Sequence, residues 1–274
     1  MAATPDITLN NGISMPQVGF GVFQIPETET TAAVATALEA GYRSIDTASA
    51  YGNETGVGTA LKASGIPRDE LFITTKLWNS DQGYDETLRA FDASVARLGL
   101  DVLDLYLIHW PTPKHGKYLD TWRAMENLYQ QGRIRAIGVS NFLPEHLRAV
   151  AGLGGTVPAV NQIEVHPRLQ QRTAQEANAE LGVVTEAWSP LAQAGVLDDP
   201  AVTRIATAHD RTPAQVVLRW HVQQGRVIIP KSVTPDRIRQ NLALFDFELS
   251  ADEMVAIDGL ESDGRTGPHP DHFN

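Results

Sequence analysis

The feature that most constrains the fold is a repeated alternation of short apolar segments with helical ones. Six apolar segments rich in β-branched residues recur, at 71–76, 102–109, 134–140, 158–165, 182–189 and 226–232, and the segments 17–21 and 43–46 bring the strand candidates to eight. Stretches of helical periodicity lie between them, for example at 85–99 and 212–225. Because parallel strands need a crossover connection between them, this order indicates parallel strands covered by helices. Eight repeats in 274 residues are typical of a closed (β/α)₈ TIM barrel.

A doubly wound parallel sheet is the alternative architecture. Such a sheet usually carries a glycine-rich phosphate turn after an early strand. Neither G-x-G-x-x-G nor G-x-x-x-x-G-K-[ST] occurs in the sequence. We therefore favour the barrel.

Two segments fall outside the eight repeats. The segment 7–16 contains Asn11-Gly12 between alternating residues, which predicts a β-hairpin that caps the bottom of the barrel. The segment 249–260 begins with Ser250, and Glu253 three residues later completes a capping box, which predicts an extra helix after the last repeat. No linker or charge block divides the chain, so we expect a single domain over residues 1–274.

The charge balance and the absence of cysteine exclude several classes of function. Lys and Arg number 22 against 33 Asp and Glu, and the net charge of −11 disfavours nucleic acid and anionic membranes as partners. Without cysteine there can be no disulfide, thiol catalysis or Cys-ligated metal. The first ten residues lack a signal sequence, and no run of eighteen apolar residues occurs. We therefore expect a cytoplasmic protein. We also expect a monomer, because no stripe of residues typical of a subunit interface stands out.

Polar residues occupy the ends of the predicted strands, where the active site of a barrel lies. The strand ends carry Asp46, Lys76, His109, Ser140, Asn141, Gln162, Glu164, Trp188, Ser189, Lys231 and Ser232. The loop after the second strand brings Tyr51 to the same face. Taken singly, each residue has a structural interpretation, such as a loop cap, a snorkelling lysine or a core histidine. Their joint placement at one end favours a functional site.

The chemistry that needs these residue types is proton donation to a carbonyl oxygen. The usual pKa of tyrosine, about 10, is too high for an efficient acid near neutrality. A neighbouring ammonium lowers that pKa, and a carboxylate holds the ammonium in place. We therefore predict Tyr51 as the acid, Lys76 as the group that lowers its pKa, and Asp46 as the anchor of the lysine. His109 would donate a hydrogen bond to the substrate oxygen.

Longer motifs give these residues a family context. The segments GYRSIDTASAYGNETGVG (41–58), ITTKLW, DLYLIHWP, GVSNF (138–142) and IIPKSVTPDRIRQN (228–241) together resemble the aldo-keto reductases. The resemblance covers nearly the whole chain and is greatest to the bacterial branch that includes 2,5-diketo-D-gluconate reductase. It implies a TIM barrel, NADPH as cofactor, and a catalytic tetrad of Tyr51, Lys76, His109 and Asp46.

The resemblance also assigns residues to the two ends of the cofactor. Ser140, Asn141 and Gln162 would bind the nicotinamide carboxamide, and Trp188 would stack on the ring, with core packing as its alternative. The loop of Ser189, Pro190 and Leu191 would fold over the pyrophosphate. The far end is assigned to Lys231, Ser232, Val233, Thr234, Arg237, Gln240 and Asn241. Positive charge at a helix start favours the 2′-phosphate, and hence NADPH over NADH.

The substrate pocket is the least defined part of the sequence. Phe23, Trp78 and Trp110 would supply apolar walls, and Trp110 could equally belong to the core. The short C-terminal tail predicts a small lid and a compact pocket, suited to small dicarbonyls, sugar-derived ketoacids or short aldehydes. His269 and His272 have the spacing of a metal pair but lack a third ligand, so we predict no metal.

Three functions remain open from the sequence. The first is an NADPH-dependent carbonyl reductase. The second is a catalytically idle NADPH-binding regulatory subunit, although such a protein can lose members of the tetrad and none is lost here. The third is a lyase or aldolase that uses Lys76 as a Schiff-base amine, which pairing of that lysine with Asp46 disfavours.

Overall fold

The computed structural model describes residues 4–274, so the first three residues of the expected domain lie outside the described residues. The strands are β1 (Asp6–Thr8), β2 (Ser14–Pro16), β3 (Phe20–Gly21), β4 (Ser44–Asp46), β5 (Phe72–Leu77), β6 (Leu103–Ile108), β7 (Ile134–Ser140), β8 (Val160–Glu164), β9 (Val184–Trp188) and β10 (Val227–Ile228). The α-helices are α1 (Glu27–Ala40), α2 (Glu54–Ala63), α3 (Tyr84–Leu98), α4 (Tyr118–Gln130), α5 (Pro144–Ala151), α6 (Arg172–Glu180), α7 (Pro200–His209), α8 (Pro213–Gln223), α9 (Pro235–Leu242) and α10 (Ala251–Asp258).

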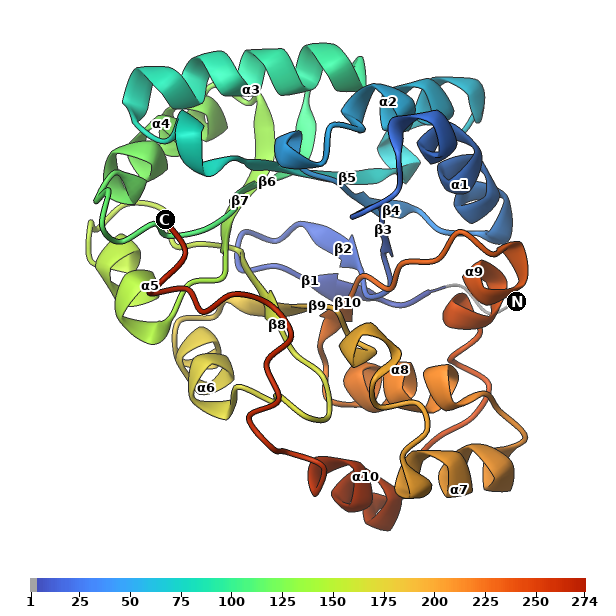
Figure 1. The fold of residues 1–274 in the computed structure, drawn as a ribbon. Helices are drawn as coiled ribbons and strands as arrows, with labels where there is room; N and C mark the ends of the chain where they lie inside the picture. The colour runs from blue at the N-terminus through green and yellow to red at the C-terminus, as the bar shows by residue number, and fades with distance from the viewer. Residues whose placement is uncertain (1–3) are drawn as a thin grey trace.

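The eight strands β3 to β10 form one parallel sheet in chain order, and the sheet closes on itself (Figure 1). At the seam, the backbone N–H of Gly19 donates to the carbonyl of Ile228 at 2.8 Å, and the N–H of Ile228 donates to the carbonyl of Gln17 at 3.0 Å. The chain therefore folds as a (β/α)₈ barrel, as the alternation predicted. The eighth strand is shorter than predicted, because Pro230 has no N–H to continue the ladder.

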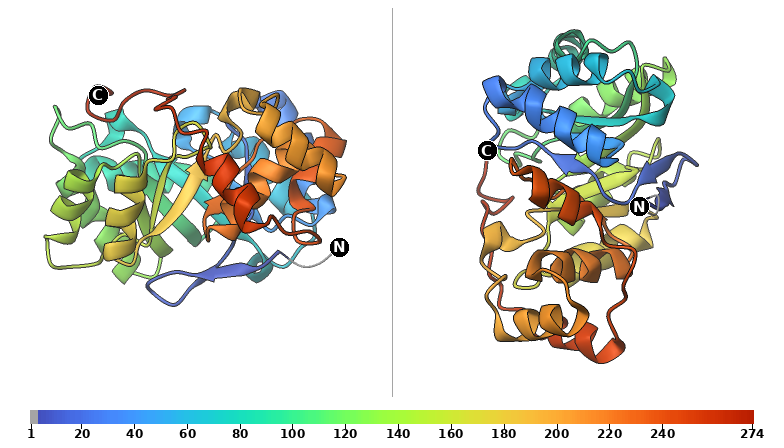
Figure 2. Two further views of the ribbon diagram at one scale, coloured as in Figure 1. Left: turned by 90° about the horizontal axis from the view of Figure 1, so that it is seen from below. Right: turned by 90° about the vertical axis from the view of Figure 1, so that its right-hand side faces the viewer.

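The hairpin and the extra helix are both confirmed. Strands β1 and β2 pair antiparallel, and Gly12 takes the left-handed φ of 84° that their turn requires. The hairpin lies at one end of the barrel and the C-terminal tail at the other (Figure 2, left). Ser250 and Glu253 form the predicted capping box of α10. Helix α7 was not predicted, and it shares a small apolar core with α8 and α10.

The barrel interior is layered along its axis. Near the hairpin it is filled by apolar side chains, including Met15, Phe72, Leu105, Val160 and Val227. Successive inward positions on a strand lie two residues apart, so each strand passes from an apolar floor to a polar end. Burying each large apolar side chain of this floor stabilises the fold by roughly 1.5–3 kcal/mol. The floor therefore supports a polar layer at the carboxyl ends of the strands.

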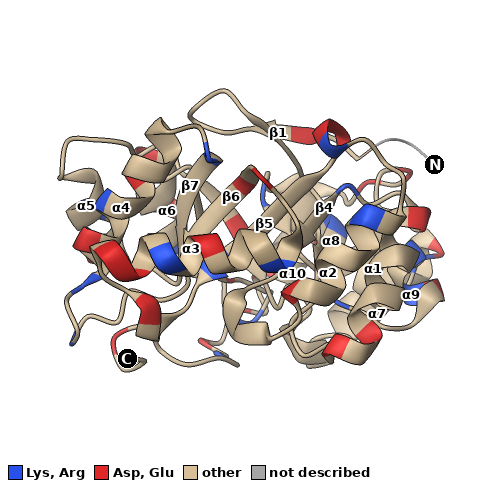
Figure 3. Cartoon of the chain, turned by 90° about the horizontal axis from the view of Figure 1, so that it is seen from above, with Lys and Arg blue, Asp and Glu red and all other residues tan. Residues whose placement is uncertain are grey.

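The outer surface shows no single-sign belt in the view of Figure 3, where acidic and basic positions are interspersed along the helices. Among residues 4–274, no helix is both long enough and apolar enough to cross a membrane.

Candidate active site

A cavity of about 1330 Å³ opens at the carboxyl ends of the barrel strands. The structure places most of the predicted residues in its wall: Phe23, Asp46, Tyr51, Trp78, His109, Trp110, Ser140, Asn141, Gln162, Trp188, Ser189, Pro190, Leu191, Lys231, Ser232, Arg237, Gln240 and Asn241. Three predicted residues do not line it, namely Lys76, Val233 and Thr234. Lys76 is fully buried behind the wall.

Asp46, Lys76 and Tyr51 come together as the sequence predicted. Strands β4 and β5 are in register with Asp46 opposite Thr74, so the side chain of Lys76 continues one step beyond Asp46 toward the cavity. The Lys76 ammonium donates to Asp46 Oδ1 at 2.6 Å, to the carbonyl of Thr47 at 2.9 Å and to the Tyr51 hydroxyl at 3.4 Å. Each of its three hydrogens therefore has an acceptor.

A short 3₁₀ turn delivers the tyrosine. The turn spans Ser49–Tyr51 and ends at Gly52, whose φ of 67° reverses the chain. The Ser49 hydroxyl donates to the carbonyl of Lys76 at 3.0 Å and so ties the turn to β5. The phenol ring is half-buried and faces the cavity.

The direction of the tyrosine pKa corrects one expectation. Burial raises the pKa of Tyr51 above its usual value of 10, and although Lys76 lowers it, Asp46 raises it again, so the net direction is upward. The sequence predicted a lowered pKa because it reveals the ammonium but not the burial. For Lys76, burial lowers the pKa, but Asp46 and Tyr51 outweigh burial and raise it, so the ammonium stays charged.

His109 lies beside the phenol in a neutral state. Burial lowers the pKa of His109 well below 6.5, and the charge of Lys76 lowers it further. Its ring is 5.7 Å from that of Tyr51 and 5.2 Å from that of Trp78, edge-on to both. Nδ1 is buried and finds no hydrogen-bond partner among residues 4–274. An uncharged imidazole therefore forms part of the cavity wall.

Gln162 links two carboxyl groups across the barrel. Its Nε2 donates to Asp46 Oδ2 at 2.8 Å and to Glu186 Oε2 at 2.9 Å. Glu186 is fully buried, and burial together with Asp46 raises its pKa to about 8. Sequence reasoning missed Glu186. Its position two residues before Trp188 puts both on the same side of β9, and this alternation could have identified it.

Ser140, Asn141 and Trp188 form a second network in the wall. The Trp188 indole N–H donates to Asn141 Oδ1 at 2.8 Å, and Asn141 Nδ2 donates to the carbonyl of His109 and to the Ser140 hydroxyl. Asn141 adopts a left-handed φ of 63°, a conformation that asparagine tolerates better than most residues. These contacts hold the indole against the cavity.

The far end of the cavity is cationic. Lys231 and Arg237 are exposed there, beside the start of α9, and neither has an acidic partner within 4 Å among residues 4–274. Gln240 and Asn241 of α9 complete this end. Val233 is 50 % exposed, Thr234 takes the N-cap position of α9, and neither lines the cavity, so their assignment to cofactor binding stays a prediction.

These residues fit the dinucleotide that the resemblance implies. One end of the cavity offers amide and hydroxyl groups beside a tryptophan, and the other offers the cations Lys231 and Arg237. The volume and the charge separation suit a long ligand with a polar ring at one end and phosphate at the other. The loop after β9 lines the space between with Ser189, Pro190 and Leu191, and also with Gln193 and Ala194, which were not predicted.

Aromatic side chains wall the remaining part of the cavity. Phe23 lies 5.0 Å from the ring of Tyr51, and Trp78 and Trp110 flank His109. The C-terminal tail adds Phe273, whose ring is 4.6 Å from that of Trp110. The sequence indicated only a small lid, whereas the tail forms a wall, because nothing local in a short Pro- and Gly-rich segment reveals where it docks.

Glu164, at the end of β8, anchors the tail. Its carboxylate accepts hydrogen bonds from the backbone N–H groups of Thr266 and Gly267, at 2.6 and 3.1 Å, and from the Thr266 hydroxyl. Burial raises the pKa of Glu164, but these bonds and one from His166 more than offset it, so the pKa is lowered. The anchor is therefore ionised at neutral pH.

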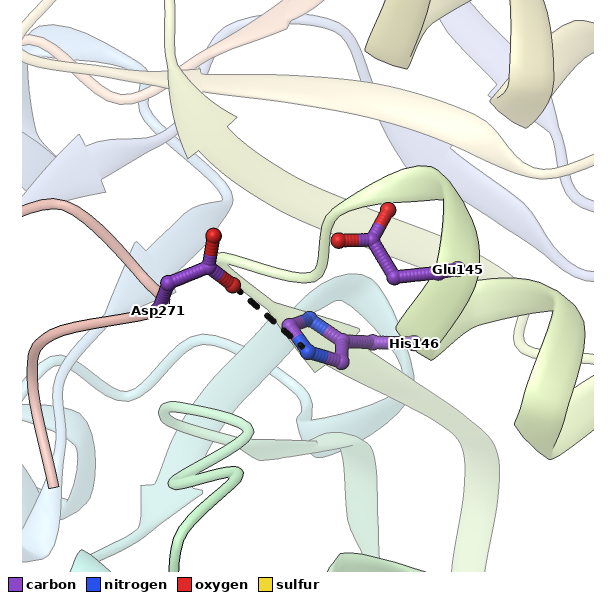
Figure 4. Close-up of side chains that lie close together, drawn as sticks. All are labelled: Glu145, His146 and Asp271. Carbon is purple, nitrogen blue, oxygen red and sulfur yellow. Dashed lines mark ion pairs between the residues drawn. The ribbon is translucent and has the colours of Figure 1, made fainter.

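A cluster of ligand-type side chains lies between α5 and the tail, and none of them lines the cavity. Glu145 and His146 from α5 face Asp271 of the tail, with 3.9 Å between His146 Nε2 and Asp271 Oδ1 (Figure 4). The N–H of Leu143 donates to His146 Nδ1 at 3.4 Å, which leaves the proton on Nε2. A protonated Nε2 suits a histidine–carboxylate contact rather than metal ligation. We assign no metal to this cluster.

Comparison with known proteins identifies a family and close relatives of this chain. The model of the Aldo/keto reductase family matches residues 17–262. The chain is 52% identical over 268 residues to a glyoxal reductase of Bacillus subtilis, covering 97% of this chain and 96% of the relative. It is 51% identical over 275 residues to methylglyoxal reductase DkgA of Yersinia pestis, covering 100% and 99%.

Solved structures agree with the fold. The crystal structure of a Gox0644 mutant in complex with NADPH superimposes with a TM-score of 0.96 at 48% sequence identity, and covers the whole of both chains.

Proposed function

The chain belongs to the aldo/keto reductase family, and we propose that it reduces small dicarbonyls, sugar-derived ketoacids and short aldehydes with Tyr51 as the general acid. It is an NADP-dependent oxidoreductase that acts on carbonyl compounds, with NADPH as its cofactor. The observation that carries the proposed mechanism is the continuous contact from Asp46 through Lys76 to the Tyr51 hydroxyl at the cavity wall. The cytoplasmic location and the monomeric state remain expectations.

The cofactor would be held by the two polar ends of the cavity. Ser140, Asn141 and Gln162 would meet the carboxamide, and Trp188 would face the ring. Lys231, Ser232 and Arg237 would bind the 2′-phosphate, with Gln240 and Asn241 at the adenine. When bound, NADPH supplies the hydride that the carbonyl carbon receives.

The proton that the substrate oxygen receives comes from a side chain of the protein. The phenol of Tyr51 is protonated at neutral pH, since its usual pKa is about 10 and burial raises that pKa further, so the acid is available before the reaction. As negative charge develops on the substrate oxygen, the proton leaves the Tyr51 hydroxyl for that oxygen. The Lys76 ammonium, 3.4 Å away, stabilises the phenolate that remains, and Asp46 keeps the ammonium charged and aimed.

His109 orients the carbonyl without competing for the proton. Its lowered pKa keeps the ring neutral, so the ring can donate one hydrogen bond and adds no positive charge beside the phenol. The Schiff-base alternative for Lys76 loses support for a related reason. A fully buried, charged ammonium with three acceptors is neither deprotonated nor free to attack a carbonyl.

Two observations support small dicarbonyls as substrates. Two relatives that align over nearly their whole length are named glyoxal and methylglyoxal reductases. The reacting end of the cavity is enclosed by the rings of Phe23, Trp78, Trp110 and Phe273, which limits the size of the group that can approach the phenol. Vicinal carbonyls are also strongly electrophilic, so a weak acid suffices.

The test follows NADPH consumption with methylglyoxal, 2,5-diketogluconate and simple aldehydes. Tyr51→Phe should lower kcat by about 10²–10⁴-fold, the usual contribution of a general acid. NADPH affinity, measured by fluorescence titration, should change far less. Tyr84→Phe is the matched control, because Tyr84 is exposed at the start of α3.

Two results would count against the proposal. Full turnover in Tyr51→Phe would remove the tyrosine from the role of acid. Tight NADPH binding without turnover of any carbonyl would favour the idle regulatory subunit instead.

A further inference from the structure

A buried carboxyl group that the proposed mechanism does not use lies directly behind the tetrad. Glu186 is fully buried on β9, in register with Gln162 on β8 and with Val227 on β10. Within residues 4–274, the one hydrogen bond of its side chain is with Gln162, whose amide nitrogen also reaches Asp46. The contacts therefore run without interruption from Glu186 through Gln162, Asp46 and Lys76 to Tyr51.

The geometry at Glu186 is that of a neutral acid. Oε2 accepts from Gln162, but Oε1 is buried and has no partner among residues 4–274. A buried carboxylate oxygen without a donor carries a large desolvation cost, which protonation removes. Asp46 adds to that cost, because the same amide brings a second carboxylate close. Burial and Asp46 together raise the pKa of Glu186 to about 8, in agreement with the contacts.

The amide of Gln162 gains a fixed orientation from this arrangement. Both hydrogens of its Nε2 are used, one by Asp46 and one by Glu186. The amide oxygen is therefore the atom left to face a ligand in the cavity that Gln162 lines. Without the Glu186 contact, the amide would be held by Asp46 alone.

We propose that Glu186 is a positioning residue of the reductase: as a neutral acid it fixes Gln162 between itself and Asp46, and its ionisation in alkaline solution slows reduction. This inference rests on the proposed function. An ionised Glu186 would place a second negative charge beside Asp46. That charge raises the pKa of Tyr51 and so weakens the acid.

Two charged groups near Glu186 shift its pKa in opposite directions. Asp46 from β4 opposes its ionisation, and Lys76 from β5 favours it. Tyr51, from the turn after β4, is the group that responds. On β8 the neighbour of Glu186 is the uncharged Gln162, and β10 contributes the apolar Val227 and Ile228. The pH midpoint of the Glu186 titration is therefore determined by groups in the barrel interior.

The first measurement is an infrared pH titration of the protein without cofactor or substrate. The carbonyl stretch of a protonated carboxylic acid should be present at pH 7, fade with a midpoint near pH 8, and be missing in Glu186→Gln. Glu180→Gln, an exposed carboxyl on α6, is the control that should keep the band. Glu186→Asp is a second variant, and it should move the band if the Gln variant fails to fold.

The second measurement is the pH profile of kcat for reduction. The wild type should lose activity on the alkaline side with a midpoint near that of the infrared band. In Glu186→Gln, which cannot ionise, the alkaline midpoint should rise by about one pH unit or more. A merely structural role would lower kcat at every pH and leave the midpoint in place.

The outcomes separate this inference from the proposed function. Absence of the acid band at pH 7, or identical alkaline midpoints in the two proteins, overturns the role of Glu186. A titrating band in a protein that turns over no carbonyl overturns the proposed function but still supports a neutral Glu186. A band and a kcat profile that shift together support both.

Discussion

Individual side chains in this barrel are set by neighbours far away in the sequence. Gln162 and Asp46 are 116 residues apart, yet one amide hydrogen joins them. Lys76 depends on contacts from β4 and from the turn that follows it. Ionisation at this site is therefore a property of the assembled interior, and a single substitution should change it measurably.

Stability should reveal the proton on Glu186. The folded state keeps this proton up to about pH 8, whereas the unfolded chain releases it near the usual value of 4.5. The folded state thus binds more protons between these values, and the free energy of unfolding falls as pH rises through this window. At about 1.4 kcal/mol per pKa unit, the loss is about 5 kcal/mol at most.

The comparison of wild type with Glu186→Gln isolates this contribution. From pH 5 to pH 8, the unfolding free energy of Glu186→Gln should rise relative to that of the wild type. Above pH 8, the difference between the two proteins should stay constant. Chemical denaturation at each pH measures it, and all other titrating groups are common to both proteins. A difference that does not change with pH would mean that Glu186 is ionised when folded.

Arg237 should decide much of the preference for NADPH over NADH. Arg237→Met should weaken NADPH binding by about 10- to 100-fold, the effect of losing one charge-assisted hydrogen bond, and should leave NADH binding nearly unchanged. Arg239→Met, also exposed on α9 but paired with Asp236, is the matched control. Fluorescence titration of both cofactors measures the ratio. An equal loss for both cofactors would argue against a 2′-phosphate contact.

At the scale of elements, the tail shows how one buried carboxylate fixes a segment without regular structure. Residues 259–274 contain no helix or strand, yet Glu164 holds their backbone over the cavity. The position of Phe273 against Trp110 follows from this anchor. Glu164 is thus one of several contacts that join tail and barrel, together with the backbone N–H of Gly264, which donates to the carbonyl of Arg168.

Glu164→Gln should release the tail. The variant loses the charge that two backbone N–H groups and the Thr266 hydroxyl share, so hydrogen exchange at Thr266 and Gly267 should become faster. Glu176→Gln, an exposed carboxyl on α6, should leave this exchange unchanged. Exchange followed by mass spectrometry resolves the segment. Unchanged protection in Glu164→Gln would mean that the other contacts of the tail hold it without this carboxylate.

At the scale of the whole molecule, barrel closure joins the two ends of the chain. Residues 17–19 pair with residue 228, so the first and last strands of the barrel depend on each other. We therefore propose that the chain behaves as one domain. The proposed tetrad draws on β4, β5 and β6, which are three consecutive strands of the closed ring.

Calorimetry should show one unfolding transition. The calorimetric and van't Hoff enthalpies should agree, as expected for a single cooperative unit. Fluorescence and far-ultraviolet circular dichroism should report the same midpoint. Two resolved transitions would divide the barrel into units that unfold separately.

The sequence by itself determined the architecture and the place of the candidate active site. Alternating strands and helices predict the barrel, and polar residues at strand ends predict where Asp46, Lys76 and His109 meet. Both signals are local, since strand periodicity and chain order fix which end of the barrel a residue reaches. The tertiary structure alone decided the raised pKa of Tyr51, the partner of Glu186 and the docking of Phe273. These depend on burial and on contacts between distant segments, which no local pattern records.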